Sequence, residues 1–149
     1  MEITERLEVP CEPGELYEHV GDLDRYPSWM RLVHAAERVD DPQGRSAWTV
    51  ELRARIGPLA RSKRLRMVRS DAIPGQLVVF ERAELDGRVH ARWALRAELE
   101  PSPGGSELTM RLSYSGSLWT GGLLDRVLED EIRRGSASLI ALVTAGTTR

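Results

Sequence analysis

The spacing of apolar residues changes once along this chain, near residue 120, and this change constrains the fold more than any other feature. Before that point apolar and polar residues alternate, which is typical of β-strands with one buried and one solvated face. The alternation is clearest over residues 48–56, 89–99 and 108–114. From Leu123 to Ala145 the apolar residues instead recur at helical spacing, over roughly 30 to 35 Å of helix. The sequence therefore predicts an antiparallel sheet covered by one long helix.

Turn-forming residues divide the segment from Val33 to Ser115 into a meander of strands. Asp86-Gly87 is the sharpest turn signal, because both residue types tolerate the positive φ angles of a two-residue hairpin turn. It predicts a tight hairpin whose second strand covers residues 89–99.

Ahead of the meander, Ile3–Val9 alternates as a first strand. Pro13 suits the first turn of a short helix, and Gly21 is expected to end that helix in the left-handed conformation. A second short helical turn covers Asp22–Trp29 and is interrupted at Pro27. The whole chain is thus predicted to be an α+β fold with about seven strands and two short helices after the first strand.

Length and composition limit the class of protein. The 149 residues suit a single domain over residues 1–149, and 41% hydrophobic with 30% charged residues is ordinary for a globular protein. No segment has the roughly 18 consecutive apolar residues of a membrane span, and no secretory signal is visible, so a cytoplasmic location is expected. The net charge of −2 argues against a nucleic-acid binder, and the single cysteine, Cys11, excludes an internal disulfide.

Several motifs resemble those of one superfamily. Residues 9–17 (VPCEPGELY) and 22–29 (DLDRYPSW) resemble the opening shared by bacterial polyketide cyclase/dehydrase-like and coenzyme Q-binding proteins. Residues 56–59 (IGPL) and 121–125 (GGLLD) are similar to segments of relatives of the carbon monoxide dehydrogenase G subunit. The order of elements resembles that of the START and Bet v 1-like (SRPBCC) superfamily. This resemblance implies a helix-grip fold, in which a curved antiparallel sheet wraps around the long C-terminal helix and encloses a cavity for a lipophilic ligand.

Residues on the inner faces of the strands and of the long helix are the candidate ligand contacts. Because protein interiors pack densely, a cavity is indicated by small or polar residues at positions where large apolar ones are expected. Glu131, Gly135 and Ser138 interrupt the apolar stripe of the long helix in this way. Tryptophans on inner strand faces offer flat apolar surface and one N–H donor. The predicted ligand-binding residues are Trp29, Trp48, Val50, Met67, Trp93, Leu95, Met110, Tyr114, Leu128, Glu131 and Gly135.

Glu131 and Tyr114 are also the candidate catalytic residues, because a carboxyl group and a phenolic hydroxyl can each act in general acid–base catalysis. A buried carboxylate requires a partner, and Arg69 or Arg82 could supply it. The strand alternation does not show whether either of these side chains points inward or outward. Resemblance to aromatase/cyclases implies a pocket arginine on a strand. This chain has Met67 where that arginine is expected, which argues against cyclase activity.

Neither a metal nor a cofactor is predicted. His19, His34 and His90 lack the spacing of metal ligands, and no phosphate-cradling loop or nucleophile motif is present. His90 lies among outward-facing residues and is expected at the surface.

Basic residues gather in the middle of the meander and predict a positively charged outer face of the sheet. These residues are Arg53, Arg55, Arg61, Lys63, Arg64 and Arg66. Such a face would attract an acyl carrier protein or an anionic membrane surface; an ordinary solvated face of mixed charge is the alternative. The sequence makes no prediction about the oligomeric state.

The residues and the resemblance together favour binding or transport of a hydrophobic small molecule, such as a lipid, a quinone-like or a polyketide-like compound. The alternative is a polyketide cyclase or aromatase that positions Glu131 and Tyr114 as acid and base in the same cavity. An adaptor that acts through the basic face is a third possibility. The lack of a standard catalytic constellation in the sequence favours the first.

Overall fold

The computed structural model describes residues 2–115 and 123–147. The strands are β1 (Glu2–Val9), β2 (Val33–Val39), β3 (Ala47–Ile56), β4 (Leu59–Ile73), β5 (Leu77–Arg82), β6 (Trp93–Ser102) and β7 (Gly105–Tyr114). The helices are α1 (Pro13–Val20), the 3₁₀ helix η1 (Leu23–Ser28) and α2 (Leu123–Thr147). The predicted order of one strand, two short helices, a meander and a long helix is confirmed.

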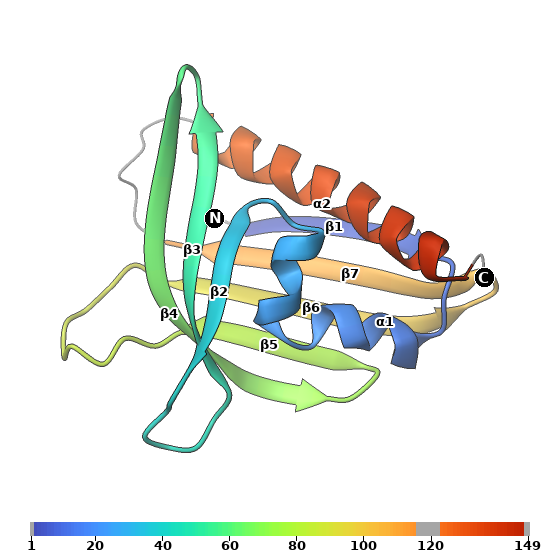
Figure 1. Ribbon diagram of the computed structural model, residues 1–149, viewed down its shortest axis with the longest axis horizontal. Helices are drawn as coiled ribbons and strands as arrows, with labels where there is room; N and C mark the ends of the chain where they lie inside the picture. Colours follow the sequence, from blue (N-terminus) through green and yellow to red (C-terminus); the bar gives the residue numbers. More distant parts are fainter. Residues whose placement is uncertain (1, 116–122, 148–149) are drawn as a thin grey trace.

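The strands form one seven-stranded antiparallel sheet in the order β1-β7-β6-β5-β4-β3-β2. Strands β2 to β7 therefore pair with their neighbours in sequence, and β1 pairs with β7 at one edge of the sheet, with Ile3 opposite Leu112. Strands β3 and β4 form a long hairpin that stands away from the rest of the sheet in Figure 1. The sheet is strongly curved as a result.

The helices cover the inner face of this sheet. Helix α2 crosses it from beside the β3–β4 hairpin to the opposite end, and it packs on β1 and β3 (Figure 1). Helix α1 packs on β6 and β7, while η1 packs on β2 and β3. One hydrophobic core lies between the helices and the sheet. None of the described helices is long and apolar enough to cross a lipid bilayer.

Gly21 ends α1 as predicted, but its backbone conformation differs from the prediction. Its φ is −79°, within the ordinary right-handed region. A Cβ atom at this position would lie 2.8 Å from Cε1 of Tyr17 and 2.9 Å from its carbonyl oxygen. Glycine is needed here for close approach, not for a left-handed turn.

The predicted tight hairpin at Asp86-Gly87 is wrong. Gly87 does have a positive φ of 72°, but it lies within a loop of residues 83–92, and β6 begins only at Trp93. Val89, expected on the inner strand face, is fully exposed.

The loop arises because the chain continues along β4 after β5 ends. The backbone N–H of Ala83 donates to the carbonyl oxygen of Arg66 at 2.9 Å, and the Glu84 carboxylate accepts from the Arg66 N–H at 2.9 Å. The Asp86 carboxylate accepts the N–H of Arg88 at 2.9 Å. These bonds stabilise a local turn before the chain enters β6, so the turn residues form a loop instead of a two-residue hairpin.

Helix α2 is rotated relative to the predicted stripe. Leu128, Glu131, Gly135 and Leu139 are buried as expected. Ser138, predicted to face the sheet, is exposed, and Ser136 is buried instead. The buried hydroxyl of Ser136 donates to the carbonyl oxygen of Ile132 at 2.9 Å, so its polar group is satisfied within the helix.

Candidate functional site

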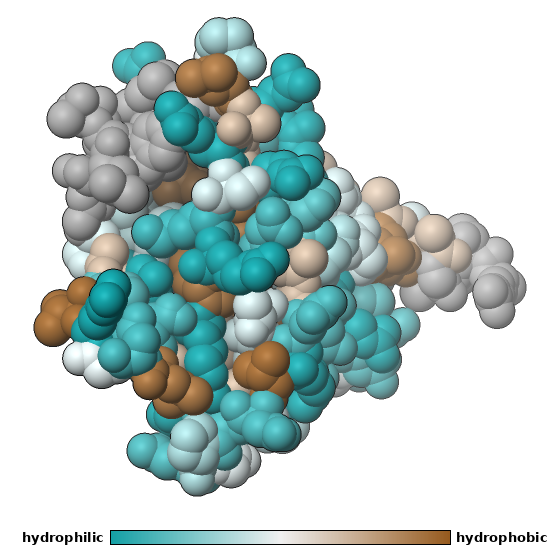
Figure 2. All heavy atoms as spheres, turned by 60° about the vertical axis from the view of Figure 1, so that its left-hand side comes forward, coloured by the Kyte–Doolittle hydropathy of each residue, from teal (hydrophilic) through white to brown (hydrophobic). Residues whose placement is uncertain are grey.

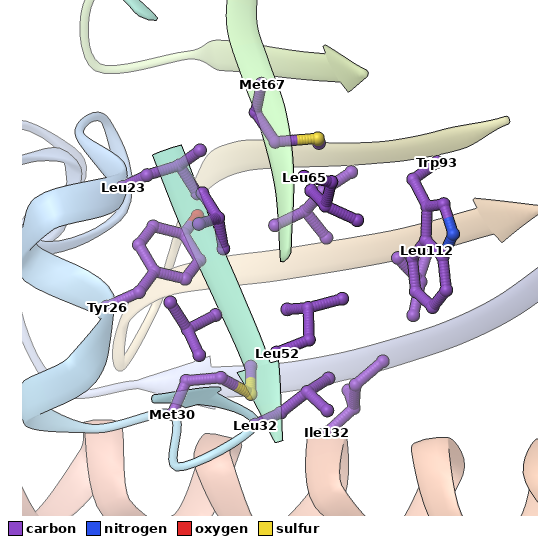
Figure 3. A pocket seen from close by; sticks show the side chains of 13 residues that line it. Leu23, Tyr26, Met30, Leu32, Leu52, Leu65, Met67, Trp93, Leu112 and Ile132 are labelled. Atoms are coloured by element: carbon purple, nitrogen blue, oxygen red, sulfur yellow. The ribbon is translucent and has the colours of Figure 1, made fainter. Parts of the chain in front are cut away.

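A cavity of about 60 Å³ lies on the inner face of the sheet, enclosed by the β3–β4 hairpin, β6, β7, η1 and α2 (Figure 3). Its lining residues are Leu23, Tyr26, Met30, Leu32, Val33, Val50, Leu52, Leu65, Met67, Trp93, Leu95, Leu112 and Ile132. The Tyr26 hydroxyl donates to the carbonyl oxygen of Val20 at 2.9 Å, and burial raises the pKa of Tyr26 above its usual value. Apart from the indole N–H of Trp93, the described lining residues therefore offer the cavity hydrocarbon, aromatic and thioether surface.

Strand register creates this apolar wall. Val50 of β3 lies opposite Leu65 of β4, and Leu95 of β6 lies opposite Leu112 of β7. Residues that are directly opposite in an antiparallel pair share one face of the sheet. The alternation along each strand thus places both pairs toward the helices.

Four of the predicted ligand contacts line the cavity, namely Val50, Met67, Trp93 and Leu95. The other nine lining residues were not predicted from the sequence. Leu52, Leu65 and Leu112 belong to inner strand faces, so the alternation could have identified them. The lining residues of η1 and of the segment that follows it carry no periodic signal.

Trp48 lies in the core beside the cavity and does not line it. Its ring is fully buried, edge-on to Phe80 with centroids 5.5 Å apart, and its Nε1–H donates to the Asp24 carboxylate at 2.8 Å. The guanidinium groups of Arg38 and Arg69 lie 5.1 Å and 5.9 Å from the ring centroid. Trp48 thus links η1, β2 and β4 to β3.

Trp29, Met110 and Leu128 are buried outside the cavity lining. The Trp29 Nε1–H donates to the carbonyl oxygen of His19 at 3.2 Å, and its ring packs on Tyr26 with centroids 4.6 Å apart. Trp29 therefore supports the cavity wall from behind Tyr26. The ligand-binding role of all three residues stays a prediction.

Tyr114 stacks on Trp93, with ring centroids 5.3 Å apart, and so stands one layer behind the cavity wall. Its hydroxyl donates to the carboxylate of Asp125 at the start of α2. Burial, followed by the hydrogen bond and charge of Asp125, raises the pKa of Tyr114 above its usual value. The phenol is therefore held protonated, and its proton is directed at Asp125.

Glu131 is buried, with 5% of its surface exposed, and its partner is Arg31. Arg31 Nε lies 3.0 Å and 2.9 Å from the two carboxylate oxygens, and Nη2 lies 2.7 Å from Oε1. The Arg31 side chain itself is 62% exposed. The ion pair joins the segment after η1 to α2, beside the lining residues Leu32 and Ile132.

Neither arginine predicted to pair with Glu131 does so. Arg69 donates to the Asp22 carboxylate at 2.7 Å and to the carbonyl oxygen of Gly21 at 2.8 Å. Arg82 lies opposite Met67, but its guanidinium donates to the carbonyl oxygen of Ala91 at 3.2 Å. The partner of Glu131 instead comes from a non-periodic segment, where the strand pattern gives no information.

Gly135 allows η1 and the segment after it to approach α2. A Cβ on Gly135 would lie 2.7 Å from Sδ and 3.0 Å from Cε of Met30, a residue that lines the cavity. The glycine thus makes room for a cavity wall; it does not line the cavity itself.

We expect Gly135→Ala to keep the melting temperature close to that of the parent protein. Alanine favours a helix by about 1 kcal/mol over glycine, which offsets the cost of displacing the flexible Met30 side chain into the cavity. Binding of an alkyl probe should weaken because the displaced thioether occupies cavity volume. Thermal unfolding and probe titration check both expectations; a failure to fold would show that Met30 cannot move.

The predicted basic outer face is only partly present. Three of its residues point outward and are exposed, namely Arg53, Arg55 and Arg64. Lys63 and Arg61 lie opposite Leu52 and Ala54, so they belong to the inner face of the hairpin. Arg66 is 9% exposed. The side of the molecule turned forward in Figure 2 is mostly hydrophilic, with small separate hydrophobic areas.

The buried guanidinium of Arg66 and that of Arg45 both bind Asp41. Arg66 Nη2 lies 2.9 Å from Oδ1, Arg45 Nε lies 3.0 Å from Oδ2, and the Asp41 side chain is fully inaccessible to solvent. Hydrogen bonds from Arg45 and then from Arg66 hold the pKa of Asp41 well below its usual value. This cluster fastens the β2–β3 loop to β4.

A depressed folded-state pKa means that Asp41 stabilises the fold at pH values above its unfolded pKa of about 3.9 and loses this effect as the pH falls below it. At neutral pH we expect the parent protein to have a clearly higher melting temperature than the Asp41→Asn variant. The difference between the two melting temperatures should narrow progressively below about pH 4. Thermal unfolding across this range checks the prediction, and a pH-independent difference contradicts it.

No group of three or more His, Cys, Asp or Glu side chains within residues 2–115 and 123–147 is arranged to hold a metal ion. His90 lies at the surface, and its Nε2 is 2.7 Å from the Asp86 carboxylate.

A curved antiparallel sheet that grips one long C-terminal helix defines the helix-grip fold of the START and Bet v 1-like superfamily. Within it, the chain belongs to the family described as polyketide cyclase / dehydrase and lipid transport, whose model matches residues 1–144. No curated protein sequence matches the chain at a significant level.

Solved structures share the fold at low sequence identity. TTHA0849 from Thermus thermophilus has a TM-score of 0.77 and 16% identity, covering 99% of this chain and 100% of that one. A START superfamily protein from Mycobacterium smegmatis has a TM-score of 0.74 and 15% identity, covering 98% and 99%. The Zhui aromatase/cyclase from Streptomyces sp. R1128 has a TM-score of 0.69 and 11% identity, covering 95% and 92%. These likenesses show the fold alone.

Proposed function

We propose that this protein, acting as one domain, binds or transports a hydrophobic small molecule in the cavity between the sheet and α2. The observation that carries the proposal is the apolar lining, in which the hydroxyl of Tyr26 is already bonded to the backbone. Such a surface gains free energy by covering apolar area, at roughly 25 cal/mol per Å². Lipids, quinone-like and polyketide-like compounds present that kind of area, and the family's lipid-transport description supports the proposal.

Occupation by such a ligand requires the cavity to widen. Its volume of about 60 Å³ is small beside the roughly 300 Å³ or more of typical ligand pockets. Met30 and Met67 line it, and their unbranched side chains change rotamer at low cost. Leu52 and Leu95 are only half-buried, so the ligand enters from the side where they lie.

A cyclase or aromatase is the second candidate, favoured by the hydrogen bond between Tyr114 and Asp125 directly behind Trp93. Tyr114 would donate a proton to a polyketide only after its hydrogen bond to the Asp125 carboxylate breaks. Glu131, the other candidate acid or base, is held by Arg31. Turnover of a candidate poly-β-ketone, abolished in Tyr114→Phe, would support this function; unchanged turnover in the variant excludes Tyr114 as the acid.

We also propose that the exposed arginines of the hairpin's outer face attract an acyl carrier protein or an anionic membrane. They are Arg53, Arg55 and Arg64. Attraction at long range is screened over about 10 Å at 0.1 M salt, so binding to anionic vesicles should fall as salt rises. Binding that is equal for neutral and anionic vesicles contradicts a role for these charges.

Organic extraction of the purified protein followed by mass spectrometry tests the proposed function. A co-purifying hydrophobic compound is the expected result. Titration with alkyl probes should also change the tryptophan fluorescence, because Trp93 lines the cavity. In Trp93→Phe the fluorescence change should shrink while calorimetry still detects binding. If no compound is extracted and no probe binds by either method, the proposal is wrong.

A further inference from the structure

Lys63, the only lysine of the chain, lies at the edge of the apolar cavity. It is directly opposite Leu52 in the β3–β4 pair and two residues before Leu65, and both leucines line the cavity. Opposite residues in an antiparallel pair have Cβ atoms about 5 Å apart on the same face. The half-buried Lys63 side chain therefore starts from the inner face, next to the half-buried Leu52.

The ammonium group of Lys63 makes no hydrogen bond or ion pair with any residue that the structure describes. The Glu84 carboxylate acts on the charge of Lys63, but it already has other partners. One Glu84 oxygen accepts the backbone N–H of Arg66 at 2.9 Å, and the other lies 3.5 Å from Nε of Arg82. Arg61 lies on the same inner face of the hairpin, opposite Ala54. Lys63 thus offers a cationic hydrogen-bond donor beside the cavity that no described residue uses.

This environment disfavours the charged form of Lys63. Burial, followed by the charge of Arg82, lowers the pKa of Lys63 below its usual value, and Glu84 only partly opposes this effect. An anion placed at the ammonium group would relieve both effects, because it restores a hydrogen-bond acceptor and offsets the like charge.

We propose that the ligand is an amphipathic anion, with an apolar chain in the cavity and a terminal carboxylate or phosphate against Lys63. This inference rests on the proposed function and adds the chemical class of the ligand to it. The apolar lining selects the chain, and the lysine selects the charged end, because a single flexible ammonium suits one anionic group at the cavity mouth.

Titration of the full chain with dodecanoate, dodecyl phosphate and dodecanol, below their micellar concentrations, tests the inference. At least one of the two anions should bind about 10-fold more tightly than the alcohol, which is the size expected of one partly solvated charge-assisted hydrogen bond. Comparison of the two anions shows whether carboxylate or phosphate is preferred. In Lys63→Met the preference should disappear while the affinity for dodecanol stays the same.

Arg96→Met is the matched control, because it removes one positive charge from an exposed position next to the lining residue Leu95, on the opposite, outer face of the sheet. It should keep the preference for the anion. The inference is wrong if the parent protein binds the alcohol as tightly as both anions, or if Lys63→Met and Arg96→Met retain the preference equally. Failure of all three probes to bind would instead overturn the proposed function itself.

Discussion

Replacement of Trp48 by alanine is expected to lower the free energy of unfolding by about 4 kcal/mol, the central value for truncating a buried tryptophan. The indole ring is fully buried against Phe80, and no part of it lines the cavity. Its removal leaves an internal void, which the rigid sheet around it fills only in part. For a chain of this length the loss corresponds to a fall in melting temperature of about 8 to 16 °C. Chemical and thermal unfolding measure both quantities.

Trp48→Phe and Asp24→Asn separate the parts of this effect. Phenylalanine keeps most of the packing but removes the N–H that Asp24 accepts at 2.8 Å. Asparagine at position 24 keeps an oxygen acceptor for the indole. We expect both variants to lose less than half as much stability as Trp48→Ala. A Trp48→Ala protein with unchanged melting temperature and no ligand binding would show that Trp48 is a ligand contact after all.

Trp48 illustrates how far strand alternation can predict a site. The alternation correctly placed Trp48 and Val50 on the same inner face of β3. It could not predict how far along the strand the cavity extends, because that depends on the helical segment that packs above. Leu23 and Tyr26 of η1 line the cavity together with Val50, whereas Trp48 is enclosed by other core residues.

Charged residues were harder to place than apolar ones. Residues 59–64 of β4 are polar on both faces apart from Leu59 and Ala60, so no alternation distinguishes the inner face from the outer one. The inner position of Lys63 follows from its pairing with Leu52, which depends on the exact turn at Gly57. Glu131 was correctly expected to be buried, since its place follows from helical spacing. Its partner Arg31 lies 100 positions away, in a segment without periodicity.

The overall fold was more predictable than the cavity, because it depends on many residues that carry the same information. Six consecutive strands each repeat the two-residue period, so an error at Asp86-Gly87 shifted the start of β6 and left the strand order intact. The cavity depends instead on single contacts, such as the approach of Met30 to Gly135. No repeated pattern in the sequence reports on a single contact of this kind, so a wrong inference about it is not corrected by neighbouring residues.

Leu65→Phe is expected to abolish most ligand binding without unfolding the protein. Leu65 is 3% exposed and its side chain points into the cavity (Figure 3). A phenyl ring at this position takes up part of the existing 60 Å³, so the core gains contacts that were missing. Exclusion of three or four methylene groups of a ligand costs binding about 3 kcal/mol, or about 100-fold in Kd. The melting temperature should stay the same or rise.

Leu65→Ala should act in the opposite direction, because it enlarges the cavity while destabilising the fold by about 2 to 4 kcal/mol. Affinity for dodecanol should rise in this variant. Leu139→Ala is the matched control, since Leu139 is fully buried in α2 but does not line the cavity, so its truncation should cost comparable stability and leave affinity unchanged. Calorimetric titration of the three variants separates the outcomes. Equal affinities in Leu65→Phe and Leu65→Ala would place the ligand outside this cavity, because the affinity of a chain bound inside it depends on the space that residue 65 leaves.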